Sequence, residues 1–337
     1  MPSLRARSAP APAAPGQPAT GSLVAAFAAV YVIWGSTYLA IRWAIETTPP
    51  LLMAAARFLL AGGMVYAWVR ARGARRPTGA EWRAAAIAGG LMLGGGNGGV
   101  VVAEQWVPSG MAALLVASVP LWLVGLDALF GSRRRPSRRA QLGLLGGFAG
   151  VALLGGAPGT GAGGPEELLG ALIVLAGCAS WAAGSLYVQR APKPSEPLTW
   201  VAMQMITGGA VLAVASLALG EPAALELGAV SVRSALAFAY LVVFGSLVAY
   251  SAYVWLLHAT TPARVGTYAY VNPVIALLLG WGLAGEPLGG RSLLAAAVIV
   301  GSVVLIVSES AGGAPRGGAR GTGAGAQQAP AAPGGEP

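Results

Sequence analysis

The chain has 337 residues, of which 55% are hydrophobic and only 10% are charged, and its formal net charge is +9. Because a soluble domain usually has about a quarter charged residues, this composition excludes an ordinary soluble globule and favours a multispanning membrane protein. The positive charge does not indicate a nucleic-acid partner, since the basic residues lie in short stretches between apolar runs, which is a topology signal.

The apolar runs are continuous rather than alternating, so they predict membrane-spanning helices and not a barrel of strands. A spanning helix needs about 20 mostly apolar residues. Segments of this kind lie at 23–43, 50–70, 84–103, 109–130, 140–156, 168–189, 199–219, 235–257, 263–284 and 291–308. The ends of the chain, 1–22 and 309–337, are rich in Ala, Gly and Pro and are predicted to be disordered tails, and 157–167 is a predicted external Gly-rich linker.

The basic residues are distributed unevenly between the two sides of the predicted spans. Of the 21 Lys and Arg residues, 17 lie in the tails or in loops on the same side as the tails. The positive-inside rule therefore predicts that both termini are cytoplasmic, which agrees with an even number of spans. Arg42, Arg233 and Arg291 are expected on the outer side, and Arg57 lies within the second span.

The chain contains an internal repeat. Trp34 and Trp181 lie in apolar segments, and Pro50 and Pro197 begin the next segments; both pairs are 147 residues apart (181 − 34 = 147; 197 − 50 = 147). This predicts two halves, 23–156 and 168–308, of five spans each, so the second half must enter the membrane from the opposite side. Inverted repeats recur in secondary transporters because exchanging the conformations of the halves turns an inward-open state into an outward-open one.

Several short stretches also resemble one known family in their order and spacing. They are Trp34-Gly35-Ser36-Thr37-Tyr38-Leu39-Ala40-Ile41-Arg42, Pro49-Pro50 through Arg57-Phe58, Ala103-Glu104-Gln105 with Pro108-Ser109-Gly110, Tyr268-Ala269-Tyr270-Val271-Asn272-Pro273, and Gly285-Glu286-Pro287-Leu288. From about Leu23 to Ser308 the chain is similar to the EamA family of the drug/metabolite transporter superfamily. The resemblance implies a ten-helix, five-plus-five inverted-repeat transporter of the inner membrane with a central cavity, and the export of amino acids and related metabolites.

Arg57 is the most informative single position. It lies about seven residues into the second predicted span, roughly 10 Å from its outer end. A buried arginine is costly in a membrane and must face the bundle interior or a wet cavity. Its planar guanidinium suits a substrate carboxylate, while the alternative is an internal partner, either Glu104 or backbone carbonyls. The repeat pairs Arg57 with Gln204, which keeps the polarity but not the charge.

Aromatic and small polar residues of other spans complete the predicted substrate site. Trp34 and Ser36 on the first span and Trp181 on the sixth can supply walls and hydroxyls for a small organic ligand, although helix packing is the alternative for each. Asn97 lies in a glycine-rich part of the third span, and this buried amide needs partners. It is expected to touch substrate, to bond a neighbouring helix, or both.

Two prolines mark predicted breaks in spanning helices. Pro273 follows Asn272 in the ninth span and removes the donor for the Ala269 carbonyl; Pro120 is a looser counterpart in the fourth span. Broken helices in both halves point to a midplane site, with a static kink as the alternative. Tyr268, Tyr270 and Asn272 are therefore further candidates for substrate binding.

Two titratable residues are candidates for coupling or gating. Glu104 is the only plausible proton carrier that faces the outer half of the bundle. His258, the only histidine, is predicted at the cytoplasmic end of the eighth span, where it could sense pH or be incidental. With one Cys and one His, no metal site is expected, and no cofactor is expected.

These observations predict a secondary transporter that exports small metabolites, amino-acid-like or drug-like, by alternating access. The expected partners are a small-molecule substrate and the lipid bilayer, not nucleic acid, with the protein a monomer or homodimer in a bacterial inner membrane. One alternative is a membrane enzyme such as a lipid-modifying transferase. The sequence contains no nucleophile–base or metal-ligand pattern, which argues against this alternative. Another is a scaffold or sensor, which would gain nothing from an inverted repeat.

Overall fold

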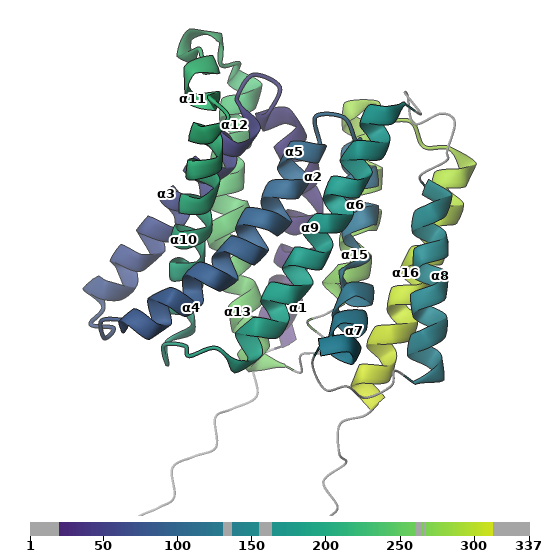
Figure 1. Cartoon of the computed structure of the whole chain (residues 1–337), viewed down its shortest axis with the longest axis horizontal. Helices are drawn as coiled ribbons and strands as arrows, with labels where there is room; N and C mark the ends of the chain where they lie inside the picture. Colours follow the sequence, from purple (N-terminus) through teal and green to yellow (C-terminus); the bar gives the residue numbers. More distant parts are fainter. Residues whose placement is uncertain (1–19, 131–136, 155–163, 261–264, 266, 313–337) are drawn as a thin grey trace, which may run out of the picture.

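The computed structural model describes residues 20–130, 137–154, 164–260, 265 and 267–312, and every regular element within these ranges is a helix (Figure 1). The first half contains α1 (Thr20–Ala28), η1 (Ala29–Ile33), α2 (Trp34–Ala44), α3 (Pro50–Ala71), α4 (Gly79–Gly89), η2 (Gly90–Asn97), α5 (Gly98–Ala103), α6 (Ser109–Val116), α7 (Val119–Phe130) and α8 (Arg138–Leu154). The second half contains α9 (Pro165–Arg190), α10 (Pro197–Ala218), α11 (Glu221–Ala224), η3 (Leu227–Ala229), α12 (Val232–Tyr240), η4 (Leu241–Val248), α13 (Ala249–Ala259), α15 (Tyr268–Ala284) and α16 (Gly290–Gly312).

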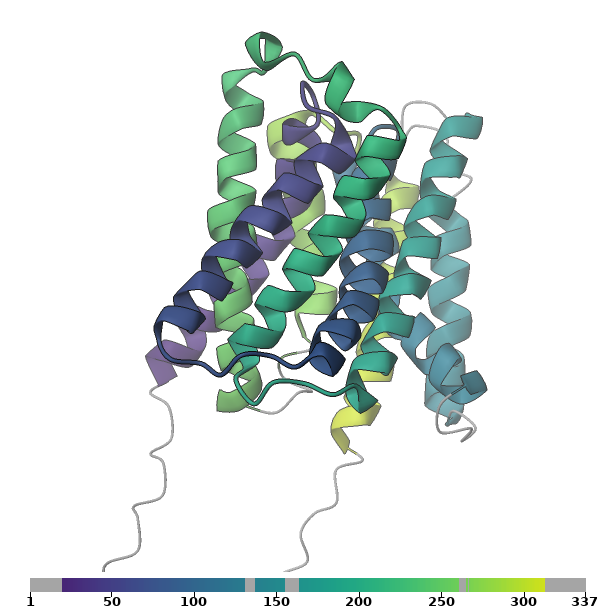
Figure 2. The ribbon, with the colours of Figure 1, turned by 60° about the vertical axis from the view of Figure 1, so that its left-hand side comes forward.

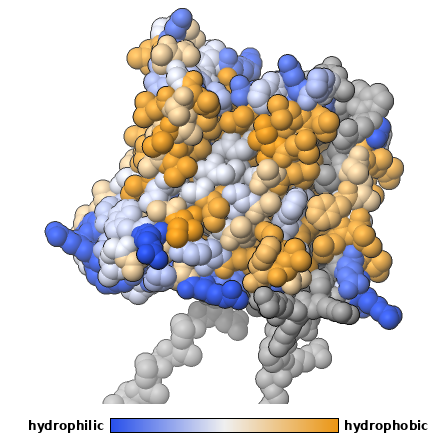
Figure 3. Space-filling model, in the orientation of Figure 1, coloured by the Kyte–Doolittle hydropathy of each residue, from blue (hydrophilic) through white to orange (hydrophobic). Residues whose placement is uncertain are grey.

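Several of these elements join into longer helices that are suited to a membrane. Seven are long and apolar enough to cross one: Thr20–Ala44, Pro50–Ala71, Gly79–Ala103, Ser109–Phe130, Pro165–Arg190, Pro197–Ala218 and Val232–Leu256. Two shorter apolar helices are Val271–Ala284 and Gly290–Leu305. On the face shown in Figure 3, hydrophobic residues cover much of the middle of the molecule and hydrophilic ones gather near its two ends. The described part of the chain is therefore a helical, multispanning membrane protein, while the ten-span inverted repeat stays a prediction.

Some predicted boundaries are wrong, because small and polar residues continue the helices beyond their apolar cores. The first helix begins at Thr20, inside the predicted tail 1–22, and α16 continues to Gly312, beyond the predicted end at 308. α9 begins at Pro165, inside the predicted linker 157–167. Proline suits the first turn of a helix because its fixed φ is helical and its missing N–H is not needed there.

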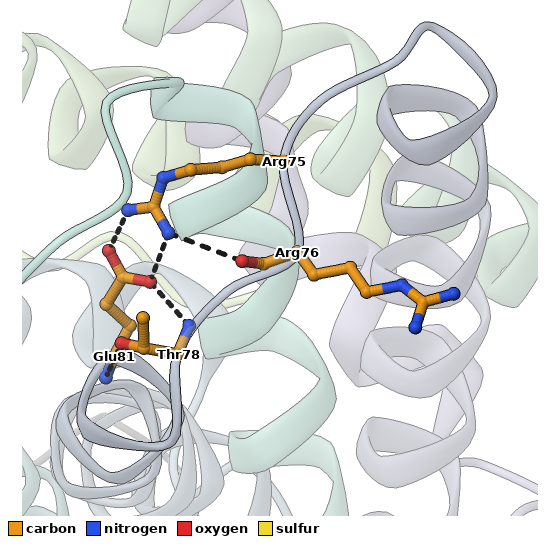
Figure 4. Close-up of polar contacts among 4 residues, drawn as sticks. All are labelled: Arg75, Arg76, Thr78 and Glu81. Atoms are coloured by element: carbon orange, nitrogen blue, oxygen red, sulfur yellow. Dashed lines mark hydrogen bonds and ion pairs between the residues drawn. The ribbon is translucent and has the colours of Figure 1, made fainter.

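The third long helix starts earlier than the predicted 84 because a polar cap extends it. The Thr78 hydroxyl accepts from the Glu81 backbone N–H at 3.3 Å, and the Glu81 carboxylate accepts from the Thr78 N–H at 2.7 Å (Figure 4). This reciprocal capping box satisfies two N–H groups at the start of α4. Arg75, in the loop before it, forms an ion pair with Glu81, which holds the turn between α3 and α4 in place.

Three of the long helices contain π-helical stretches, in which the hydrogen-bonded turn is one residue longer than in an α-helix. The stretch η1 lies in the first helix, η2 in the third and η4 in the eighth, Val232–Ala259. Stretches of this kind are rare in proteins and are frequent at functional sites. The residue ranges of η2 (90–97) and η4 (241–248) lie 151 residues apart, close to the repeat interval of 147 (241 − 90 = 151).

The two halves meet closely along α3 and α10, which lie side by side in Figure 2. Glycines at equivalent places in the repeat permit the approach. A Cβ at Gly62 would lie 2.7 Å from Met205 Cβ, and one at Gly209 would lie 3.0 Å from Leu59 Cγ. Because small residues let helices approach each other in membranes, these contacts join the halves into one bundle. At the opposite side of the bundle, α8 packs against α16 (Figure 1).

The third long helix is packed between two helices of the second half. Gly89 faces Gly208 of α10 so closely that a Cβ on either would meet the backbone of the other helix. On another side, Gly96 faces Trp181 and Gly177 of α9. The glycine-rich segment of the third helix thus permits close packing against α9 and α10.

Candidate functional site

The start of α1 and the end of α16 lie at one end of the bundle, which we call the α1 end (Figure 1). At the opposite end is a hollow of about 600 Å³. It is charged and aromatic, and these lining residues are Arg42, Trp43, Glu46, Trp106, Arg233 and Glu286. A volume of this size suits a small organic molecule.

An ion pair and a helix cap hold part of this lining in place. Arg233 on α12 and Glu46 after α2 form an exposed ion pair at 3.4 Å. Glu286 accepts hydrogen bonds from the backbone N–H groups of Ser109 (2.7 Å) and Gly110 (3.0 Å), at the N-terminus of α6. A carboxylate is favoured there because the free N–H groups and the helix dipole attract negative charge. Glu286 therefore joins the second half of the chain to the first.

Glu221 makes an equivalent contact at another helix start. Its two carboxylate oxygens accept from the backbone N–H groups of Leu51 (3.1 Å) and Leu52 (2.7 Å), in the first turn of α3. The helices α3 and α6 of the first half are thus both capped at this end by glutamates of the second half. A turn or cap role is the sequence-based expectation for Glu286, but the sequence does not indicate which helix either glutamate caps, because the capped residues lie about 170 positions away.

Arg57 lies in the bundle interior with 5% of its surface exposed. Its Nε donates to the Ser246 hydroxyl of η4 at 2.9 Å, and its Cζ lies 4.8 Å from the centroid of the Phe58 ring. Within the described residues, Nη1 is buried without a hydrogen-bond partner and no ion pair joins Arg57 to Glu104. The alternative of an ion pair with Glu104 is therefore not found among the described residues, and Arg57 Nη1 is a buried donor without a partner there.

Gly245 brings the first and eighth helices together beside this arginine. A Cβ at this position would lie 3.1 Å from Arg57 Nη2 and 3.2 Å from Thr37 Cγ2, so a larger residue would crowd the guanidinium. The backbone oxygen of Gly245 accepts a hydrogen bond from Trp34 Nε1 at 3.2 Å. Trp34 and Arg57, two of the predicted site residues, are thus neighbours through one glycine.

Trp34 also stands at the centre of an aromatic cluster. Its ring centroid lies 5.5 Å from that of Tyr250, 5.1 Å from Tyr253 and 5.2 Å from Tyr268. Tyr268 begins α15 and Tyr253 lies within two turns of the end of α13, so the cluster lies toward the α1 end. These packed rings lie toward the α1 end of the bundle, on the side away from the hollow.

Asn272 and Pro273 lie within α15, as predicted, but the amide makes a contact between helices. With its nitrogen as donor, Asn272 bonds the backbone oxygens of Tyr268 at 3.3 Å and Tyr31 at 3.2 Å. The helix continues through Pro273. Pro120 lies in the first turn of α7, directly after the break between α6 and α7. These residues shape the helices, and their contact with substrate stays a prediction.

The remaining predicted binding residues make contacts elsewhere in the bundle. Ser36 bonds the Tyr240 hydroxyl at 2.7 Å and so ties α2 to α12. Gln204 is 8% exposed and donates to Met92 Sδ at 3.7 Å. Asn97 ends η2, and its buried Oδ1 has no partner within the described residues. Among the contacts described, none joins Gln204, Asn97 or Trp181 directly to Arg57, so the predicted site is brought together only in part.

Two predictions lie outside the described side chains, those for Tyr270 and His258. Within the described residues, no group of three or more His, Cys, Asp or Glu side chains is placed to hold a metal ion.

Sequence reasoning missed Ser246, Tyr250 and Tyr253 on the eighth span. The signals were present: a glycine-serine pair interrupts an apolar run, and two tyrosines stand three residues apart, on one helix face. Arg42 and Arg233 were not predicted as site residues either. Both lie on the predicted outer side, where few basic residues occur, and this is the signal that could have identified them.

The family model of the EamA-like transporter family matches this chain twice, at residues 20–156 and 168–308. The chain belongs to the EamA-like transporter family. The two matches coincide with the halves defined by the repeat, and the family lies in the drug/metabolite transporter superfamily.

Named relatives agree with this family. The chain is 43% identical over 286 residues to "Uncharacterized inner membrane transporter YedA" of Escherichia coli strain K12, covering 84% of this chain and 90% of that protein. It is 24% identical over 292 residues to "Probable amino-acid metabolite efflux pump" of Salmonella typhimurium, covering 82% and 92%. A solved crystal structure with 22% identity matches with a TM-score of 0.59 over 86% of this chain and 99% of that one, which supports the fold alone.

Proposed function

We propose that this EamA-like transporter is a secondary transporter of the inner membrane that exports small metabolites by alternating access. The observation that carries the proposal is the asymmetry of the bundle interior. A hollow of about 600 Å³ lies at one end, the Trp34 aromatic cluster packs the interior toward the other, and the buried Arg57 lies near this cluster through Gly245. One open and one closed end is what a single state of an alternating-access carrier requires.

The packing of the halves supports an inverted repeat of five spans each. The helices α3 and α10, which are equivalent in the repeat, pack against each other through equivalent glycines, as expected beside a pseudo-twofold axis. The π-helical stretches η2 and η4 lie near equivalent places in the third and eighth helices. They supply local irregularities at which both halves can bend during the exchange of conformations.

We infer that both termini are cytoplasmic, so that the hollow faces the outside. Most Lys and Arg residues belong to the tails and to loops at the α1 end, which supports this orientation. Reporter fusions at Lys193 and Gly228, which lie in turns at opposite ends of α10, are expected to report the cytoplasm and the periplasm respectively. The same compartment for both fusions would overturn the topology.

The substrate that fits this interior is a small organic molecule with a carboxylate. Arg57 keeps an unpartnered guanidinium nitrogen in a buried site, where a hydrogen bond to a charged group is strong. The name of the Salmonella relative, an amino-acid metabolite efflux pump, favours the same class.

Untargeted metabolomics of culture medium tests the function while the substrate is still unidentified. Cells that overproduce the protein are expected to enrich a defined set of carboxylate-bearing metabolites in the medium, relative to cells with an empty vector. Cells that overproduce the Arg57→Met variant at an equal membrane level serve as the matched control. An unchanged medium composition with correctly inserted wild-type protein would contradict the export function.

A further inference from the structure

Glu104 follows the last residue of α5, and none of its surface is exposed. Neither carboxyl oxygen has a hydrogen-bond partner in the part of the chain that the structure describes. Even after relaxation, an unpaired buried charge costs several kcal/mol. A closed interior can therefore hold this side chain only as the neutral acid or together with a bound cation.

Cationic and neutral groups approach Glu104 from two helices. Arg42 on α2 donates from Nη1 to the backbone carbonyl oxygen of Glu104, so this contact does not neutralise the carboxylate. Arg57 on α3 is near enough to act on it electrostatically, and Tyr38 on α2 lies in its field. Neither arginine forms an ion pair with Glu104 among the described residues.

Acidic groups also lie near Glu104. Burial raises the pKa of the Glu104 carboxyl well above its ordinary value, and the charge of Glu286 raises it further. The two arginines act in the opposite direction but do not offset burial. The helix α9, which packs against α5, carries the buried Glu167 in its first turn. Burial and the neighbouring acidic groups thus favour the neutral form of Glu104.

The hollow lies close to this residue. Its lining includes Trp106, two positions beyond Glu104 in the chain, and Arg42, which bonds the Glu104 backbone. The repeat provides no second acid of this kind, because the position 147 residues later is Ser251 (104 + 147 = 251). Glu104 thus has no acidic counterpart at the equivalent place in the second half of the chain.

We propose that Glu104 binds a proton from the outer side and exchanges it for the ammonium group of an exported, amine-bearing molecule. The inference rests on the proposed export function. Because an occluded bundle cannot contain an unpaired carboxylate, each passage through the closed state needs either a proton or an organic cation on Glu104. One proton then enters the cell as O–H of the acid and is released to cytoplasmic water when the ammonium group replaces it. The proton gradient drives export.

Infrared spectroscopy of the full chain in lipid vesicles tests the proton site itself. At neutral pH the wild-type protein is expected to show the C=O stretch of a protonated carboxyl group, and Glu104→Gln is expected to lose it. Glu286→Gln is the matched control and is expected to retain the band, because it removes a carboxylate that accepts two backbone N–H bonds and leaves the Glu104 carboxyl in place. Absence of a Glu104-dependent band would overturn the proposal.

Export by intact cells tests the exchange. Enriched metabolites in the medium are expected to carry an amine, to accumulate faster at acidic external pH, and to fall to the empty-vector level with Glu104→Gln at equal membrane protein. Enrichment of molecules without an amine, or undiminished export by Glu104→Gln, would overturn the exchange while leaving the transport function standing. If the wild-type protein enriches nothing, the export function itself fails, and the infrared band alone then decides the proton site.

Discussion

Arg57→Lys is expected to reduce export by about 10-fold to 100-fold while leaving the membrane level of the protein nearly unchanged. Lysine keeps the charge but lacks the planar fork, so it cannot bond Ser246 and also present a second nitrogen to a carboxylate. A hydrogen bond to a charged group contributes about 1.5–3 kcal/mol, and 1.4 kcal/mol corresponds to about tenfold in affinity. The measurement is export of the enriched metabolites per inserted protein molecule.

The same substitution at the far end of the same helix is the control. Arg70 lies in the last turn of α3 and donates to the backbone oxygen of Ala74, away from the bundle interior. Arg70→Lys is expected to export normally. Ser246→Ala should fall between the two, because it leaves the guanidinium in place but unfixed. If Arg57→Lys loses inserted protein and export in equal proportion, the arginine has a structural role instead.

The second large effect is expected on stability, from Gly89→Ala. A Cβ at Gly89 would lie 2.5 Å from the backbone oxygen of Gln204 and 2.9 Å from the backbone nitrogen of Gly208. Neither atom belongs to a flexible side chain, so α10 as a whole must move away. Over-packing usually costs about 1–3 kcal/mol, and we expect the upper part of this range. Heating in detergent followed by size-exclusion chromatography measures the loss of folded protein.

The adjacent glycine provides a matched control in the same helix. A Cβ at Gly90 would meet only Val211 Cγ2 at 3.7 Å, an ordinary contact, and the backbone there is helical (φ −61°, ψ −45°). Since alanine is favoured over glycine in a helix by roughly 0.5–1 kcal/mol, Gly90→Ala should be neutral or mildly stabilising. Equal destabilisation by both variants would mean that the close contact between Gly89 and Gly208 does not hold the bundle together.

The helices could be predicted well because hydropathy and length alone constrain a spanning segment. Their ends could be predicted less well: the third helix extends back to Gly79 because of Thr78 and Glu81, whose spacing is a capping-box signature that hydropathy ignores. The stretches η2 and η4 could not be predicted, because one additional residue in a helical turn leaves no distinct pattern in the sequence.

The candidate site was likewise predictable only in part. The sequence marks Arg57 and Trp34 as unusual, because a buried cation and an aromatic residue in a span each need a reason. It does not indicate that Ser246, 189 positions away, bonds the arginine, or that Glu104 stays apart from it. Spacing along one helix specifies the face on which a residue lies but not which residue of another helix faces it.

The sequence by itself therefore determined the membrane environment, the helical class, the repeated halves and the few polar residues that enter the bundle. These follow from local rules, since every backbone group in a bilayer must be satisfied within a helix and each charge must avoid lipid. Only the tertiary structure showed at which end the hollow lies, which rings pack together toward the other end, and which buried polar groups lack partners among the described residues. Those properties depend on contacts between the two halves, where glycines such as Gly62 and Gly209 set the distance between α3 and α10.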